Sequence, residues 1–332
     1  MKLQEVIKHY IVDVENRLGH HTSIAYQQAL GYLVSLLSSV CGVNELEKIT
    51  VLHLRECLRY MIETPSEVIR QRTFGKKSNL ADSTMKTYVT NWKVFFNWCY
   101  QEELIDSDPS ARLKTPRPEK RVLKTFTSEH IYKMLDTLDL STDMGFRDYV
   151  ILLLLLDTGI RLSEIGTLLL EDVHDTYIKV RGKGRKEREV GIHPDLGKLL
   201  WKYVHKYRHP GNPDEPKIFI DCTKQGKGKA ISGPGVKGIL YRLRLALGFK
   251  DVRLSPHTFR HTFAKMYMAH GGDIFKLSRE MGHSSVRITQ RYLEDFDSTE
   301  ARKEHDSHSP LSALDISRYR KGRKKKSGQN FA

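Results

Sequence analysis

Residues 281–295, MGHSSVRITQRYLED, decide how this chain is interpreted. A Gly-His pair opens the stretch, and Tyr292 follows nine residues after His283. A tyrosine hydroxyl is a weak nucleophile at neutral pH, because its pKa is near 10. On a helical pattern a tyrosine most often packs in a core or an interface. Whether Tyr292 has a chemical role therefore depends on the charged stretches that precede it.

Length and charge limit the class of protein. The 332 residues are enough for about two domains. The chain has 55 Lys and Arg against 40 Asp and Glu, a net charge of +15. This surplus favours a polyanionic partner, with nucleic acid first and an anionic membrane surface as the rival.

Apolar runs and cysteines argue against a membrane or secreted protein. The longest apolar run, Tyr149 to Leu156, is too short to span a bilayer, which needs about 20 residues. The N-terminal MKLQEVIKHYIVDVENRL is amphipathic and lacks the apolar core of a signal peptide. The four cysteines form no C-x-x-C pair. We expect reduced thiols in a cytoplasmic protein without a membrane partner.

Residues 1–112 are predicted to be an all-helical domain. TSIAYQQALGYLVSLLSSV has apolar residues at helical spacing, with Thr22 or Ser23 as a possible cap, and VLHLRECLRYMIE is a second helix. DSTMKTYVTNWKVFFNWCYQEELI is the strongest helical pattern in the chain. Its predicted apolar face comprises Met85, Tyr88, Val89, Trp92, Phe95, Phe96 and Cys99.

Residues 113–125 are predicted to be a basic linker between two domains. Pro116 and Pro118 disfavour helix at their own positions and at the residue before each. A linker with this charge can run along DNA, and a plain solvated loop is the alternative.

Residues 126–305 are predicted to form a mixed α/β domain. TSEHIYKMLDTL begins with a capping pattern at Thr127, and FRDYVILLLLLDTGI is apolar on nearly all sides, as in a central buried helix. TYIKVRGKGRKEREVGIH predicts two strands around a Gly-Lys-Gly turn, and helical segments follow. The predicted fold is therefore mainly α with a small β-sheet.

Residues 306–332 form a separate C-terminal segment. SPLSALDI has a capping serine, a proline suited to a first helical turn and a little apolar surface. Arg318 to Lys326 holds seven basic residues and no acid, the composition of a solvated arm that often binds nucleic acid.

Two stretches of the second domain place charged residues where packing alone does not require them. In DTGIRLSEI, Arg161 and Glu164 lie three apart and share a helical face, so Arg161 can clamp a phosphate while Glu164 holds it. The alternative is a surface ion pair, which contributes little stability. In RGKGRKEREV, Lys183 lies between two glycines at a hairpin tip, near Lys186. A solvated turn is the alternative there.

A third stretch, SPHTFRHTF, places His257 and Arg260 on one helical face. His257, His261 and His283 could bind zinc, since two histidines four apart can share a metal. No Glu lies between them and no acidic third ligand is apparent, so we expect no metal and a hydrogen-bonded His261.

Taken together, two arginines, a lysine and two histidines suit a phosphoryl transition state. Beside them, Tyr292 would be a nucleophile whose phenolate is stabilised by positive charge.

Four motifs occur in a characteristic order and at a characteristic spacing: TGIRLSE, GKGRKER, HTFRH and MGHSS…RY. On these motifs the chain resembles the tyrosine recombinase, or phage-integrase-like, family. The resemblance implies that Arg161 and Arg260 bind the scissile phosphate and that Glu164 supports Arg161. It also implies roles for Lys183 as the hairpin lysine, His257 and His283 as catalytic histidines and Tyr292 as the nucleophile. One departure is Val190-Gly191-Ile192, where the family usually has Val-Pro-Leu.

The resemblance also implies the reaction and the partners. The expected partner is double-stranded DNA with a specific recombination site, bound by a homotetramer on two duplexes in the cytoplasm, near the nucleoid. Strands are exchanged through a 3′-phosphotyrosyl link and a Holliday junction without a cofactor, for integration or excision of a mobile element. Residues 1–112 resemble the core-binding domain of the family. The absence of a further arm-binding domain ahead of them argues against a lambda-like, two-site integrase.

Two rival functions share these residues. A type IB topoisomerase relaxes DNA as a monomer, and it is distinguished by whether two marked duplexes exchange strands. A catalytically decayed DNA-binding protein would form no covalent protein–DNA adduct.

Overall fold

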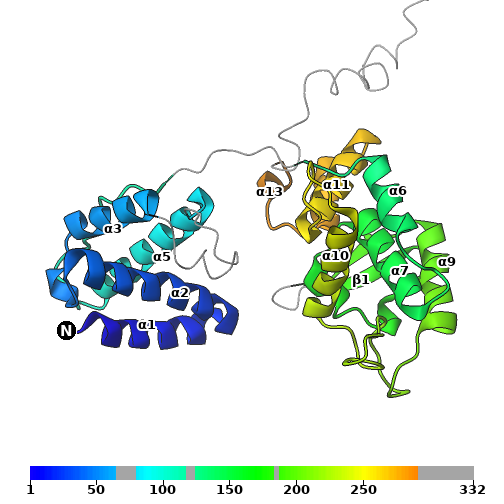
Figure 1. The fold of residues 1–332 in the computed structure, drawn as a ribbon, viewed down its shortest axis with the longest axis horizontal. Coiled ribbons are helices and arrows are strands. Elements are labelled where there is room, and N and C mark those ends of the chain that lie inside the picture. Colours follow the sequence, from blue (N-terminus) through cyan, green and yellow to red (C-terminus); the bar gives the residue numbers. More distant parts are fainter. Residues whose placement is uncertain (65–79, 117–123, 183–186, 291–332) are drawn as a thin grey trace, which may run out of the picture. The chain divides into compact units, whose positions relative to one another are not determined.

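Two compact units divide the chain, Met1–Arg121 and Val122–Ala332, and each is described by itself (Figure 1). The computed structural model describes residues 1–64, 80–116, 124–182 and 187–290. Over these residues the fold is mainly helical with a single two-stranded sheet. This confirms the predicted fold class.

Helices form the described part of the first unit. They are α1 (Leu3–Leu18), α2 (His20–Leu36) with the π-helical turn η1 (Leu37–Cys41), the 3₁₀ turn η2 (Leu46–Lys48), α3 (Val51–Glu63) and α5 (Asp82–Gln101). The predicted apolar face of α5 lies in the core, with Trp92, Phe95 and Phe96 fully buried. A helical period of 3.6 residues accounts for this, because it aligns those side chains along one side of the helix.

The start of α2 differs from the prediction. The helix begins at His20, directly after Gly19, and neither Thr22 nor Ser23 caps it. Their hydroxyls donate instead to the carbonyls of Leu18 and His20, at 3.4 and 2.8 Å. The prediction was wrong because Gly19 adopts φ +87°, which lets the chain end α1 and enter α2 without a polar cap.

By length and composition alone, one segment in the described residues could cross a membrane, Thr22–Cys41 near the N-terminus. Leu30, Leu33 and Leu37 in this segment are fully buried in the core of the first unit. The indole Nε1 of Trp92 also donates to the carbonyl of Ala29 at 3.0 Å. These contacts bury one face of the segment against the first unit.

The second unit contains most of the predicted mixed domain. Its elements are α6 (Ser128–Asp136), α7 (Asp143–Thr158), α8 (Leu162–Ile165), η3 (Leu170–Asp172), β1 (Tyr177–Arg181), β2 (Glu187–Gly191), α9 (Pro194–Lys202), η5 (Tyr203–Tyr207), α10 (Gly233–Leu247), α11 (Pro256–Ala269), α12 (Ile274–Glu280) and α13 (Val286–Gln290). Thr127 caps α6 as predicted, accepting from the His130 backbone, while His130 Nδ1 accepts from the Thr127 backbone. The imidazole thus takes the place of the acid in a capping box.

Helix α7 is the central helix of this unit, as predicted, and it contacts α9 and α11 (Figure 1). Most of its side chains are buried, including the ion pair of Arg147 and Asp148. Arg147 also donates to the Ile220 carbonyl at 2.9 Å, and Arg242 donates to Asp148 at 2.6 Å. The buried charges are therefore paired and hydrogen-bonded, as an apolar interior requires.

The predicted hairpin is present as an antiparallel pair. Tyr177 lies opposite Gly191 and Arg181 opposite Glu187, which confirms the two strands. The hairpin tip with Lys183, residues 117–123 of the predicted linker, and the tail from residue 291 lie outside the described residues.

Candidate active site

The C-terminus of α7 brings the first predicted arginine to α11. Gly159 ends the helix at φ +56°, and a Cβ at this position would overlap the Phe263 ring of α11. Glycine alone satisfies both the left-handed conformation and the close approach. The chain then runs through Ile160 into Arg161, which precedes the short helix α8.

Arg161 and Glu164 contact each other as the spacing predicts. Arg161 Nη1 donates to Glu164 Oε1 at 3.1 Å, and the Arg161 backbone N–H donates to Oε2 at 2.7 Å. The Arg161 side chain is 42% exposed, whereas that of Glu164 is only 4% exposed. Glu164 therefore does not belong to a plain surface ion pair: it is a buried carboxylate that supports a partly exposed arginine.

Burial by itself would raise the pKa of Glu164. Hydrogen bonds from Arg188 and from the Arg161 backbone, together with the charges of both arginines, bring that pKa below its ordinary value. The carboxylate is therefore ionised at neutral pH, as a support for two cations requires.

Arg260 of α11 is buried and binds backbone carbonyls. Its Nη1 donates to the Gly159 carbonyl at 2.6 Å, and its Nη2 donates to the Met281 carbonyl. Met281 is fully buried with Phe263 and Leu277, which fixes α12 against α11. Arg260 thus joins the end of α7 to the turn that carries His283.

His283 lies between Arg260 and the last described helix. Its Nε2 is 2.7 Å from Arg260 Nη2, and its Nδ1 is 2.8 Å from the hydroxyl of Thr289, which is fully buried on α13. Burial, and then the charges of Arg260, Arg161 and Arg188, lower the pKa of His283 to about 4. A guanidinium only donates, so Nε2 accepts and Nδ1 carries the proton of a neutral ring.

The structure thus brings four predicted site residues into one hydrogen-bonded cluster, Arg161, Glu164, Arg260 and His283. Arg161 reaches the cluster through Gly282, whose carbonyl accepts from Nη2 at 3.0 Å. His257 is exposed on the first turn of α11, three residues before Arg260. Lys183 and Tyr292 lie outside the described residues.

Two residues of the cluster were not singled out from the sequence. Arg188 on β2 donates two hydrogen bonds to Glu164, and Thr289 contacts His283. A signal for Arg188 existed, because it lies two positions before Val190, which is buried, and therefore on the inner face of the strand. Thr289 gave no such signal, because a threonine in a short helix is common.

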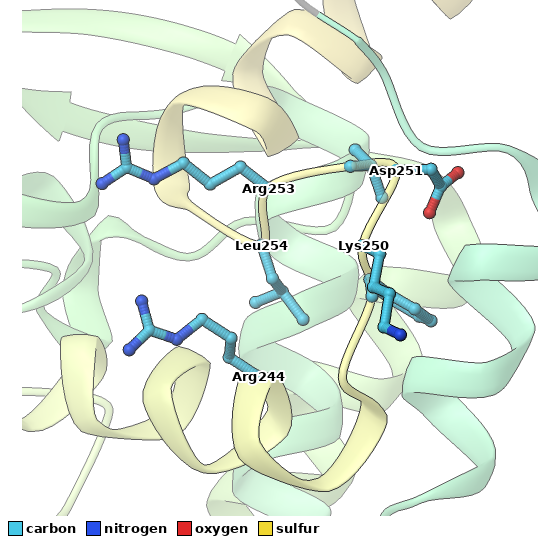
Figure 2. Close-up of a pocket in the computed structure, with 7 residues that line it drawn as sticks. Arg244, Lys250, Asp251, Arg253 and Leu254 are labelled. Carbon is cyan, nitrogen blue, oxygen red and sulfur yellow. The ribbon is translucent and has the colours of Figure 1, made fainter.

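A separate pocket of about 400 Å³ is lined by Arg244 of α10 and by residues 249–254, which follow α10, and it contains none of the predicted site residues. In Figure 2, the side chains of Arg244 and Arg253 extend toward the same side of this pocket.

In the part of the chain that the structure describes, no group of three or more His, Cys, Asp or Glu side chains could hold a metal ion. His261, considered above as a zinc ligand, is buried in α11.

Comparison with known proteins identifies the class. Residues 124–299, just over half of the chain, match the phage integrase family. The chain is 31% identical over 227 residues to tyrosine recombinase XerC of Pelotomaculum thermopropionicum, which covers 65% of this chain and 72% of the relative. It is 26% identical over 300 residues to tyrosine recombinase XerD of Listeria monocytogenes serotype 4b (strain F2365), covering 87% and 93%. The chain belongs to the phage integrase family of tyrosine recombinases, which are site-specific DNA recombinases.

Solved structures show the same fold. A lambda integrase dimer bound to a COC′ core site matches with a TM-score of 0.67 at 18% identity, covering 87% of this chain and 97% of that one. The Tn1549 transposon integrase in complex with circular intermediate DNA matches with a TM-score of 0.68 at 17% identity, covering 92% and 99%. A lambda integrase tetramer bound to a Holliday junction has a TM-score of 0.67 at 18% identity, covering 91% and 81%.

Proposed function

We propose that this recombinase cuts and rejoins duplex DNA with Tyr292 as the nucleophile, for integration or excision of a mobile element. The observation that carries the proposal is the convergence of Arg161, Arg260 and a neutral His283 around residues 281–283. The two fixed guanidinium groups in this set suit the charge that develops on a phosphoryl group during transfer. Thr289, which contacts His283, precedes Tyr292 by three residues in the sequence.

In the proposed reaction, the Tyr292 hydroxyl gives its proton to water and its oxygen forms a bond to the scissile phosphorus while the bond to the 5′-oxygen breaks. Lys183 gives a proton to the leaving 5′-oxygen, because arginine holds its protons too tightly to act as an acid. The product is a 3′-phosphotyrosyl link with a free 5′-hydroxyl. The 5′-hydroxyl of a second duplex then gives its proton to Lys183 and attacks this link, which restores the phosphodiester and frees the tyrosine as a phenolate that regains its proton from water. The ester conserves the bond energy, so no cofactor takes part.

The remaining catalytic roles follow the same geometry. Arg161 is partly exposed and binds the scissile phosphate, and buried Arg260 binds it from the other side of the cluster. His257 lies on the same helix as Arg260 and adds a further donor. Glu164 supports Arg161, and His283 supports Arg260.

The partners and domain roles are proposals of the same kind. Residues 1–112 would bind DNA as a core-binding domain and 126–305 would carry the chemistry, with 113–125 as the linker along DNA. Four protomers would act on two duplexes through a Holliday junction, with residues 306–332 docking between protomers and along phosphates. The net charge of +15 and the lambda integrase tetramer on a Holliday junction support this assembly. A cytoplasmic, nucleoid-associated location follows from the DNA partner.

A substitution at Tyr292 tests the proposal. Tyr292→Phe removes the nucleophilic oxygen and keeps the ring, so DNA binding should persist while the covalent adduct and strand exchange disappear. The substrate is a pair of differently labelled duplexes carrying the recombination site, and the products are separated on a denaturing gel with and without protease. An adduct in Tyr292→Phe contradicts the role of Tyr292. Relaxation of supercoiled DNA without exchange between duplexes would indicate the topoisomerase instead, and no adduct from the wild type would indicate a decayed enzyme.

A further inference from the structure

Arg188 is an arginine whose side chain points inward from strand β2. It lies on the same face of the strand as buried Val190, and only 14% of its side chain is exposed. Burying a guanidinium is costly unless its N–H groups find acceptors. The position of those acceptors therefore indicates what Arg188 does.

The acceptors belong to two different parts of the candidate active site. Nη1 and Nη2 of Arg188 donate to Oε1 and Oε2 of Glu164, both at 2.9 Å, and Nε donates to the Glu280 carbonyl at 2.7 Å. The pairing with Glu164 is bidentate, which is the strongest and most directional arrangement of an arginine with a carboxylate. One side chain thus joins β2 to α8 and to the C-terminus of α12.

Glu164 is shared between two arginines. While Arg188 takes both carboxylate oxygens, the Arg161 backbone and Nη1 take the same two oxygens from the other side. Two cations and one anion leave a positive charge at the cluster, and Arg161 stays 42% exposed. Without Arg188, the Glu164 carboxylate would have Arg161 as its one cationic partner in this cluster. It would then draw the Arg161 side chain inward.

Arg188 also packs beneath the turn before His283. Gly282 has φ +64°, and a Cβ at this position would lie 2.9 Å from Cζ of Arg188. The carbonyl of the same Gly282 accepts from Arg161 Nη2. The turn at Gly282 thus packs against Arg188, and its carbonyl binds Arg161.

We propose that Arg188 is a positioning residue for phosphate binding: through Glu164 and the 280–282 turn, it holds Arg161 and His283 in their orientation toward the scissile phosphate. This proposal rests on the proposed function. Arg188 does not touch the phosphate itself, and it acts only through the groups that do.

Arg181 on β1 provides a matched control. It belongs to the same hairpin and also pairs with carboxylates, those of Asp172, Glu171 and Glu187, but it makes no contact with the cluster among the described residues. If a paired arginine stabilises this hairpin without further effect, Arg181→Lys and Arg188→Lys should behave alike. Lysine keeps the charge in both and loses the planar fork.

The experiment measures single-turnover formation of the covalent adduct on a nicked duplex, well below the melting temperature of each variant. We expect Arg188→Lys to slow adduct formation about 10²-fold, since a displacement of about 1 Å at a reacting centre has an effect of that size. DNA binding should stay within a few-fold of the wild type, and Arg181→Lys should react like the wild type. Equal rates for Arg188→Lys and the wild type would overturn the proposal.

Two further measurements separate positioning from other causes. In a Glu164→Gln background, Arg188→Lys should add little to the defect, because both act through one carboxylate; independent, multiplying effects contradict the proposal. A substrate with sulfur at the leaving 5′-position needs no proton donor, so it should leave Arg188→Lys slow. If sulfur restores the rate, Arg188 acts by supporting the proton donor, and its role in phosphate binding is overturned. If the wild type itself forms no adduct, the proposed function fails, and that outcome is distinct from a failure at Arg188 alone.

Discussion

Nη2 of Arg260 lies 2.7 Å from Nε2 of His283, and this contact determines which ring nitrogen of the neutral histidine carries the proton. Because a guanidinium has no lone pair to offer, the imidazole must accept at Nε2 and carry its proton on Nδ1. The Thr289 hydroxyl lies 2.8 Å from that Nδ1. The histidine is therefore held as one neutral tautomer by a residue on each side.

The first prediction concerns the pH dependence of stability. Burial and the neighbouring arginines lower the pKa of His283 from 6.5 to about 4 in the folded protein. A lowered pKa means that the unfolded state binds the proton more readily than the folded state does. The contribution of neutral His283 to the free energy of unfolding is therefore complete above pH 6.5 and is lost as the pH falls through 4. Melting temperatures measured between pH 8 and pH 4 should therefore fall less in His283→Gln than in the wild type. An NMR titration of His283 with a midpoint near 6.5 would contradict the assignment.

The second prediction concerns Thr289. Thr289→Val keeps the shape of the side chain but removes the hydroxyl that accepts from the Nδ1–H of His283. We expect a loss of about 0.5–1.5 kcal/mol in the free energy of unfolding, the net contribution of one hydrogen bond. Adduct formation should slow as well, because the ring is no longer held in one orientation. Thr289→Ser restores the hydroxyl and should recover most of the rate, and a serine variant as slow as the valine variant would show that packing is responsible.

The third prediction compares two glycines with left-handed backbones. Gly282 has φ +64° and faces Arg188, whereas Gly248 has φ +57° with no atom within 4 Å of a Cβ. Gly248→Ala should cost about 1–2 kcal/mol of stability from the backbone alone and leave strand exchange unchanged. Gly282→Ala adds a displacement of Arg188 and should lose most of its cleavage activity. Equal activity of the two variants in an adduct assay would show that the turn tolerates the shift.

The fourth prediction assigns the proton donor. Removing a general acid should slow cleavage by about 10²–10⁴-fold. With sulfur in the leaving 5′-position, Lys183→Ala should cleave nearly as fast as the wild type, because a thiolate leaves without a proton. Arg161→Ala should stay slow on the same substrate, since phosphate binding is still impaired. If sulfur rescues Lys186→Ala and not Lys183→Ala, the donor is the second lysine of the hairpin.

Much of the molecule followed from local patterns in the sequence. The helical spacing of Trp92, Phe95 and Phe96 predicted the buried face of α5, and the apolar run to Leu156 predicted the central helix α7. The Gly-Lys-Gly turn predicted the two strands of the hairpin. These succeed because burial repeats with the period of the element, which neighbouring residues in the chain already specify. The positive charge favoured a nucleic-acid partner, and the resemblance of four sequence motifs indicated a tyrosine recombinase.

Only the tertiary structure determined how the site is held together. The start of α2 depended on the backbone angle of Gly19, and Arg188 acquired its role by meeting Glu164 from another strand. Arg161 and Gly282 are 121 residues apart in the chain and hydrogen-bonded in the fold. Spacing within one helix predicts which side chains share a face, but it contains no information on which distant carbonyl or carboxylate will be opposite them. The sequence by itself therefore determined which residues are available for chemistry. The packing of α7, α11 and α12 decided which of them share hydrogen bonds, because a buried charge is stable only where several separate segments supply its partners.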